Sequence, residues 1–148
     1  KEEVDFIGTL KDLEHVLKES DVVVLSIALN KQTYNLIGKG ELERMKRDAI
    51  LVNVARGALI DEDALYEHLK SHPDFMAGID AWWVEPFGKG RFQMDHPFCD
   101  LPNFLGSPHN SSMVPGIIAK ATAMAAQNVL KFLHGEEIRG VVSREQYL

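Results

Sequence analysis

Apolar residues gather in four short runs, and segments with helical periodicity separate them. The clearest run, residues 49–55, is followed by Arg56 and Gly57 and then by an acidic helix start at Asp61. A run of this kind is typical of a strand buried on both faces of a sheet. The other runs begin near residues 22, 75 and 104. The four strands are therefore spaced by about 25 to 30 residues, as in β-α-β units.

Amphipathic segments lie between these strands. A variant of the capping box at Thr9–Asp12 opens the first helix, and further helices are expected at residues 41–46 and 61–70. The alternation of helices with apolar strands predicts an α/β fold with a parallel sheet covered by helices on both sides. A long loop is expected from residue 83 to residue 102.

The longest apolar segment, residues 113–134, predicts one long packed helix that ends with Gly135 as its C-cap. It does not predict a membrane span, because polar and helix-breaking residues interrupt it. These residues are Pro115, Lys120, Gln127, Asn128 and Lys131.

Composition excludes several classes of protein. The 148 residues are 45% hydrophobic and 26% charged, which suits one soluble domain with a sizeable core. A net charge of -6 with scattered basic residues argues against a nucleic-acid partner. The single cysteine, Cys99, cannot form an internal disulfide, which fits a reducing, cytoplasmic location. We expect no metal, because no Cys/His spacing suggests a zinc site.

Ionisable residues follow three of the predicted strands, where the carboxyl ends of parallel strands meet at one edge of the sheet. Arg56 follows the second strand, Asp80 and Glu85 follow the third, and His109 follows the fourth. A guanidinium can bind a substrate carboxylate, an imidazole can transfer a proton, and a carboxylate can orient that imidazole. This set suits the oxidation of a 2-hydroxy acid.

Each of these residues also has an ordinary structural interpretation. Arg56 could form a weak surface ion pair with Asp61 or Glu62, Asp80 could cap a turn, and Glu85 and His109 could be solvated. The other histidines are best interpreted as surface or packing residues: His15, His68, His72, His96 and His134. The Trp82–Trp83 pair could shape the substrate pocket, but packing is the favoured interpretation.

Several motifs resemble, in order, the signatures of the D-isomer-specific 2-hydroxyacid dehydrogenase family. They are Val52–Asp61, Gly78–Pro86, His96–Pro97 and Pro102–His109. The resemblance implies that Arg56 binds the substrate carboxylate and assists hydride transfer. It implies that His109 is the acid or base and that Glu85 is its partner.

The resemblance also implies a nicotinamide cofactor, NAD or NADP. Asp80 is expected near the nicotinamide carboxamide, and the backbone of Asn53, Val54 and Ala55 is expected to line the nicotinamide pocket. We further assign Ala28 and Thr33 to cofactor binding. Residues 28–30 read Ala-Leu-Asn, where the family tends to have Pro-Leu-Thr beside the adenosine.

The glycine-rich diphosphate-binding turn of such enzymes, G-x-G-x-x-G, is not found in this sequence. The nearest matches, Gly38–Gly40 and Gly88–Gly90, are better interpreted as turns. We therefore interpret the chain as the carboxyl-terminal part of such an enzyme, with a partial Rossmann-like parallel sheet flanked by helices and a long C-terminal helix. Residues 1–112 would form the second half of the dinucleotide-binding domain. Residues 113–148 would return to the substrate domain.

The expected partners are a small 2-hydroxy or 2-oxo acid, the missing N-terminal part of the same chain and a second copy in a homodimer. The substrate class covers glyoxylate, hydroxypyruvate, phosphoglycerate and lactate, and the isolated chain is expected to be inactive. One alternative is an NAD-sensing, corepressor-like binding module, because such proteins share the scaffold and can keep the three site residues. Another is an inert domain in which these residues form surface ion pairs.

Overall fold

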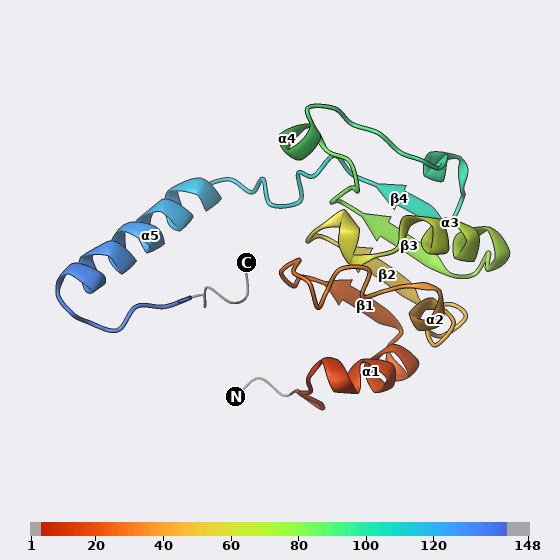
Figure 1. Ribbon diagram of the computed structural model, residues 1–148, viewed down its shortest axis with the longest axis horizontal. Helices are drawn as coiled ribbons and strands as arrows, with labels where there is room; N and C mark the ends of the chain where they lie inside the picture. The colour runs from red at the N-terminus through yellow and green to blue at the C-terminus, as the bar shows by residue number, and fades with distance from the viewer. Residues whose placement is uncertain (1–3, 142–148) are drawn as a thin grey trace. The chain divides into compact units, whose positions relative to one another are not determined.

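The computed structural model describes residues 4–141. The chain divides into two compact units, residues 1–109 and residues 110–148. The first unit contains a four-stranded sheet in the order β1-β2-β3-β4, and every neighbouring pair is parallel (Figure 1). Its strands are β1 (Val22–Leu25), β2 (Ile50–Asn53), β3 (Met76–Ile79) and β4 (Phe104–Gly106).

Helices connect the strands, as the alternating pattern predicts, but the helix expected at residues 41–46 lies earlier, at Lys39–Leu42. The α-helices are α1 (Leu13–Glu19), α2 (Lys39–Leu42), α3 (Glu62–Ser71), α4 (Pro86–Lys89) and α5 (Ile117–Leu133). Short 3-10 helices are η1 (Leu10–Asp12), η2 (Gly57–Leu59) and η3 (Phe98–Asp100). The capping box is confirmed, because Asp12 accepts a hydrogen bond from the backbone N–H of Thr9 while the Thr9 hydroxyl caps the first turn.

The long loop expected over residues 83–102 contains two short helices, α4 and η3. Pro86 occupies the first turn of α4, and Gly90 ends it in a left-handed conformation with a φ of 68°. Helices of three or four residues are too short to produce a periodic pattern of apolar positions. The sequence pattern therefore could not predict them.

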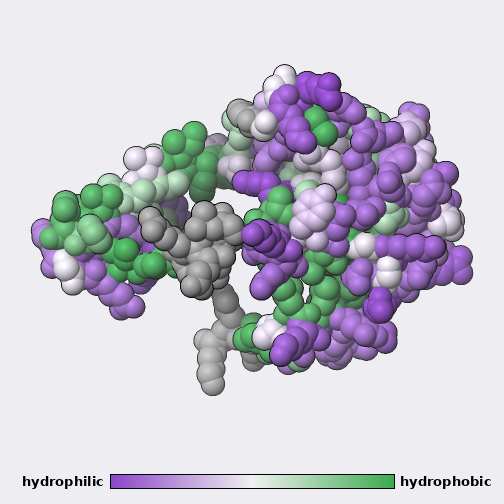
Figure 2. All heavy atoms as spheres, viewed as in Figure 1, coloured by the Kyte–Doolittle hydropathy of each residue, from purple (hydrophilic) through white to green (hydrophobic). Residues whose placement is uncertain are grey.

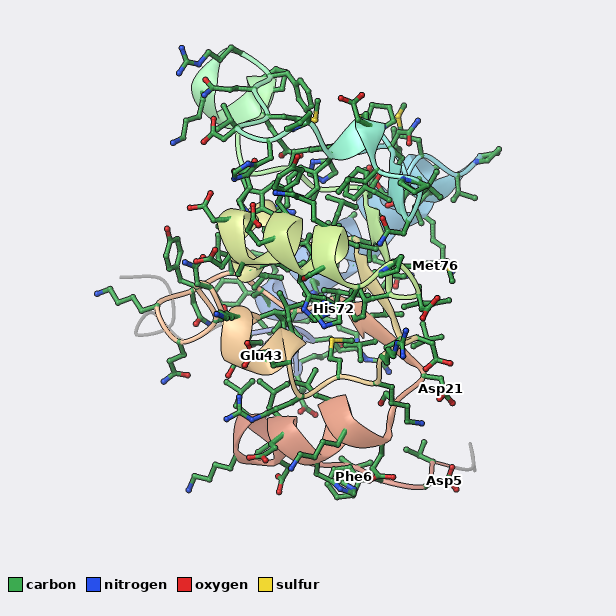
Figure 3. All side chains as sticks on the ribbon, turned by 90° about the vertical axis from the view of Figure 1, so that its right-hand side faces the viewer. Asp5, Phe6, Asp21, Glu43, His72 and Met76 are labelled. Atoms are coloured by element: carbon green, nitrogen blue, oxygen red, sulfur yellow. The ribbon has the colours of Figure 1, made fainter. Side chains whose placement is uncertain are left out.

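One face of the sheet carries the core. The alternate residues Val23, Leu51 and Ala77 lie side by side on that face and are buried, with Leu51 fully buried. Figure 3 shows α2 and α3 in front of the strands on this side. Leucine and aromatic side chains from the helices and loops complete the core: Leu17, Ile37, Leu42, Leu59, Leu65, Leu69, Phe75 and Phe98.

The opposite face of the sheet is much more open. Val22, Val24 and Met76 are 52%, 55% and 45% exposed, and Ile50 and Val52 are half-buried. The helices of the first unit therefore leave this face of the sheet largely open. An apolar run indicates that a strand avoids water on both faces, but it does not show which segment covers each face.

The second unit is built on α5. This helix begins at Ile117, four residues later than expected, because Pro115 favours an extended residue before it and Gly116 adopts a left-handed φ of 81°. Gly135, with a φ of 72°, follows the helix as predicted. No described residue of α5 is buried within its own unit, and the expected packing of this helix stays a prediction.

Figure 2 shows hydrophobic side chains along much of α5. Among residues 4–141, no helix is long and apolar enough to cross a membrane. Residues 142–148, the end of the segment expected to return to the substrate domain, lie outside the described residues.

His68, on the buried side of α3, couples the stability of the fold to pH. The centroid of its ring lies 4.7 Å from that of Phe75 and 4.0 Å from that of His72, on which it stacks. His72 lies just beyond the end of α3 (Figure 3). Burial, together with the neighbouring His72, lowers the pKa of His68 from 6.5 to about 4. The folded protein therefore resists protonation at this position more strongly than the unfolded chain does.

Stability is expected to fall as the pH drops from 6.5 to about 4, because the unfolded chain binds the proton more readily in this range. The contribution of His68 to that loss is on the order of 2 kcal/mol. His68→Gln removes the titrating group, so the free energy of unfolding of the variant protein should depend less on pH between 6.5 and about 4 than that of the wild type. Urea unfolding followed by tryptophan fluorescence measures the slope, and an unchanged slope would contradict this assignment.

Candidate functional site

Four parallel strands bring their carboxyl ends to one edge of the sheet, here called the carboxyl edge. Asn53 ends β2, Ile79 ends β3 and Gly106 ends β4, and neighbouring strand ends are paired in register. The residues that follow these strands, Arg56 and Asp80 among them, therefore emerge from the same edge. Open α/β sheets bind their ligands at this edge.

The Asn53 side chain shapes the turn that presents Arg56. Asn53 is fully buried, its Nδ2 donates to the carbonyl of Arg56 at 2.8 Å, and its Oδ1 accepts from the N–H of Ala55 at 3.0 Å. These two bonds close the turn over residues 53–56. Arg56 is exposed, and its Nη1 donates to the Ala55 carbonyl at 2.6 Å.

Gly57 lies directly against the backbone of the third strand's loop. A Cβ atom at this position would lie 2.3 Å from the carbonyl carbon of Trp82 and 2.5 Å from the backbone nitrogen of Trp83. Real Cβ contacts are never this short, and neither of these backbone atoms can move aside without shifting the loop. Glycine is therefore required, and it locks the Arg56 turn against the segment that leads to Glu85.

Glu85 and His109 form the central contact of the site, which we call the acid–base pair. His109 Nδ1 lies 2.8 Å from Glu85 Oε1, and both side chains are largely buried. Pro86 begins α4 and fixes the backbone that follows Glu85. His109 has a φ of 52°, which is unusual for a residue other than glycine and is typical of constrained functional positions.

Asp80 and Ser107 join the ends of β3 and β4. Asp80 is buried, and its Oδ1 accepts a hydrogen bond of 2.5 Å from the Ser107 hydroxyl. The Ser107 N–H also donates to the carbonyl of Ile79 at 2.9 Å. These contacts fix the backbone two residues before His109.

The loop after β1 is stabilised internally by Thr33. This side chain is buried, and its hydroxyl donates to the Ala28 carbonyl at 2.8 Å and accepts from the Asn30 N–H at 2.8 Å. Ala28 itself is exposed. Thr33 therefore maintains the shape of the loop at the end of β1, and its hydroxyl is engaged by the loop's own backbone.

A cavity of about 430 Å³ opens beside the acid–base pair. Its other lining residues are mostly apolar: Trp82, Pro86, Phe92, Cys99, Gly106, Ser107 and Pro108. An apolar hollow with a few converging polar groups is typical of a small-molecule site. In the described part of the chain, no cluster of three or more His, Cys, Asp or Glu side chains could bind a metal ion.

The predicted residues converge only in part. Glu85 and His109 are in contact. Asp80 touches neither of them in this contact but bonds to Ser107, which lies two residues before His109. The guanidinium of Arg56 bonds to its own turn and to neither member of the pair. Trp82 and Ser107 also support the pair, a role that their sequence positions did not predict, although both lie within two or three residues of a predicted site residue.

The remaining histidines have the structural roles that were expected of them. His96 Nε2 lies 2.6 Å from Asp63 Oδ1, and its ring stacks on Tyr66 at 4.4 Å. His15 packs edge to face on Phe6. These histidines lie in packing or surface contacts.

Comparison with known proteins assigns this arrangement to a family. The family described as "D-isomer specific 2-hydroxyacid dehydrogenase, NAD binding domain" matches residues 1–111. A glyoxylate reductase of Thermococcus gammatolerans is 37% identical over 143 residues, which cover 97% of this chain and 41% of that protein. A peroxisomal glycerate dehydrogenase of Arabidopsis thaliana is 40% identical over 126 residues, which cover 85% of this chain and 31% of that protein.

A solved structure shares the fold. The D-isomer specific 2-hydroxyacid dehydrogenase of Xanthobacter autotrophicus Py2, in complex with NADPH and MES, superposes with a TM-score of 0.77 at 29% identity. The superposition covers 93% of this chain and 55% of that one. The predicted α/β fold, with a Rossmann-like parallel sheet and flanking helices, is confirmed. The chain spans only about two fifths of the length of two glyoxylate reductases that it matches, 39% and 41%.

The contact between Gly57 and Trp82 gives a direct test of how the site is assembled. Gly57→Ala is expected to lower the free energy of unfolding by about 1 to 3 kcal/mol, because the added Cβ overlaps backbone atoms. Urea unfolding followed by tryptophan fluorescence measures this loss. Gly88→Ala is the matched control, because no atom lies within 4 Å of a Cβ placed there. Equal stability of the two variants would refute the proposed close approach.

Proposed function

Because this chain belongs to the D-isomer specific 2-hydroxyacid dehydrogenase family, we propose that it is the carboxyl-terminal part of an NAD- or NADP-dependent oxidoreductase. The enzyme would transfer hydride between a nicotinamide and a small 2-hydroxy or 2-oxo acid. One observation carries the proposal: a histidine and a carboxylate are in contact, 2.8 Å apart, at the carboxyl edge of a parallel sheet. This is where such folds bind nucleotides and substrates.

His109 would transfer the substrate proton. Its Nδ1 is engaged by Glu85, so Nε2 is the nitrogen that can receive or donate a proton. During reduction, the protonated imidazole would donate from Nε2 to the oxygen on the 2-oxo carbon, and during oxidation the neutral imidazole would take the proton back. Glu85 would keep the ring oriented and stabilise its positive charge.

Arg56 would bind the substrate carboxylate. A guanidinium has five N–H donors in a planar fork, and the bond to the Ala55 carbonyl uses only one of them. Because Arg56 is exposed at the carboxyl edge, its remaining donors are accessible to an anion. Its charge would also stabilise the oxyanion that develops as hydride is transferred.

The residues at the carboxyl edge fit a nicotinamide cofactor. Ile27 and Val54 are 40% and 38% exposed after β1 and β2, and they offer apolar surface to a planar ring. The backbone of Asn53, Val54 and Ala55, with Asp80, Ala28 and Thr33, would line this region. When bound, the cofactor would supply and accept the hydride.

Glyoxylate and hydroxypyruvate are the first substrates to test, because a glyoxylate reductase and a glycerate dehydrogenase are among the relatives. The complete enzyme would add a preceding part of the chain, and residues 113–148 would lead back to the substrate domain. It would also include a second copy in a homodimer, on the basis of the family resemblance. We propose a cytoplasmic location, with the single cysteine as support, and no independent turnover by this chain.

Removing the guanidinium tests the assignment of Arg56. In the complete enzyme, reduction of glyoxylate or hydroxypyruvate with NADH or NADPH is expected, and Arg56→Ala should lower kcat/KM by about 100- to 1000-fold. Arg56→Lys should recover part of this loss, because it restores the charge without the planar fork. Arg47→Ala is the control, since Arg47 forms an exposed ion pair with Asp74 at 3.0 Å. Near-normal turnover by Arg56→Ala would refute the assignment.

Glu85 should act through its contact with the His109 ring. Glu85→Gln keeps the shape of the side chain but removes the charged partner of the imidazole. In the complete enzyme it should lower kcat for the reduction of the 2-oxo acid by about 10- to 100-fold, because a ring that is held less firmly is less well aligned for proton transfer. Glu67→Gln alters a surface carboxylate that pairs with Lys70, and it should leave kcat unchanged. Steady-state kinetics measure the effect, and equal kcat values for all three proteins would disprove the role of Glu85.

A further inference from the structure

Trp82 contacts each of the three segments that carry the predicted catalytic residues. We propose that it is a positioning residue whose two N–H groups set the geometry of Glu85 and His109. The expected effect on turnover rests on the proposed function. The expected effect on the orientation of His109 does not.

The backbone of Trp82 fixes Glu85. Its N–H donates to Glu85 Oε1 at 2.8 Å, and this oxygen is the same atom that lies 2.8 Å from His109 Nδ1. A carboxylate oxygen can accept two hydrogen bonds, and two donors from different directions leave it little freedom to rotate. Trp82 therefore fixes the position of the Glu85 oxygen that contacts His109.

The indole ring of Trp82 fixes the other half of the pair. Its Nε1–H donates to the carbonyl of Ser107 at 2.8 Å, two residues before His109. The ring lies over Gly106, where a Cβ atom would be 2.7 Å from a ring carbon. Trp82 is only 7% exposed, so this hydrogen bond is largely shielded from water.

Aromatic neighbours orient the indole. The ring centroid of Phe92 lies 5.2 Å from that of Trp82 at an interplanar angle of 79°, and the ring centroid of Phe104 lies 5.8 Å from it at 61°. Such edge-to-face contacts restrict the rotation of a large ring. The backbone of the same residue also lies against Gly57, next to Arg56.

Loss of the indole N–H should affect orientation more than folding. The segment before His109 would still be attached through the Ser107 N–H to Ile79 and through the Ser107 hydroxyl to Asp80. The carbonyl of Ser107, however, would lose the partner that determines its direction. If the Ser107 carbonyl turns, the backbone that leads to His109 turns with it, and the imidazole of His109 points in a different direction.

Trp82→Phe tests this proposal, and Trp83→Phe is its matched control. Trp83 is the next residue, its Nε1–H also donates to a carbonyl, that of Ile60 at 2.7 Å, and its ring stacks on Phe98 at 5.5 Å. Both variants lose one indole hydrogen bond within the same core. Only Trp82→Phe loses a bond that reaches the segment of His109.

Two measurements in the full-length protein give the result. In NMR spectra, the imidazole resonances of His109 should shift, and the Nδ1–H signal should weaken, in Trp82→Phe but not in Trp83→Phe. In steady-state kinetics, Trp82→Phe should lower kcat about tenfold with little change in KM, because a small misalignment slows the chemical step.

Each outcome is decisive. Equal effects of the two variants on His109 and on kcat would show that Trp82 is merely structural and would overturn the proposal. If the wild-type enzyme reduces no 2-oxo acid, the proposed function fails, and the NMR comparison still decides the role of Trp82. If Trp82→Phe does not fold, replacing Trp82 by 3-benzothienylalanine keeps the shape of the ring and removes only the N–H donor. Unchanged His109 resonances in that protein would also refute the proposal.

Discussion

The parallel pairing of the four strands is the constraint on which the rest of the structure depends. Parallel strands need a crossover between each pair, and these crossovers bring every strand to its carboxyl end at the same edge. Residues as far apart in the sequence as Glu85 and His109 thereby come within 2.8 Å of each other. No local segment of the chain could place both groups.

Close approach between backbones gives this edge its accuracy. Gly57 lies against the carbonyl of Trp82, and Gly106 lies under the indole ring, so neither position has space for a side chain. Hydrogen bonds of buried polar groups complete the arrangement. Asn53 bonds to the turn that follows its own strand, and Asp80 and Trp82 both bond to Ser107 after β4. The acid–base pair is therefore supported by residues that need not touch a substrate.

Exposed apolar side chains lie on the open face of the sheet in the first unit and along α5 in the second. Val22 and Val24 are more than half exposed, although their apolar character is as strong as that of their buried neighbours Val23 and Leu25. Apolar composition reflects the burial that a residue finds in its complete surroundings. It does not show which segment supplies the covering surface, so the apolar pattern alone could not predict that the helices of the first unit leave one face of the sheet open.

The sequence by itself determined the order of the four strands and the main helices along the chain, the capping box at Thr9 and the position of each predicted site residue relative to a strand end. These features depend on local periodicity and on turn-forming residues, which are visible in the linear sequence. Only the tertiary structure decided that Glu85 meets His109 directly, that Arg56 bonds to its own turn, and that Trp82 joins the segments around them. The physical reason is that hydrogen-bond partners 24 or 25 residues apart are chosen by the packing of the strands and loops between them, and no periodic pattern records that choice.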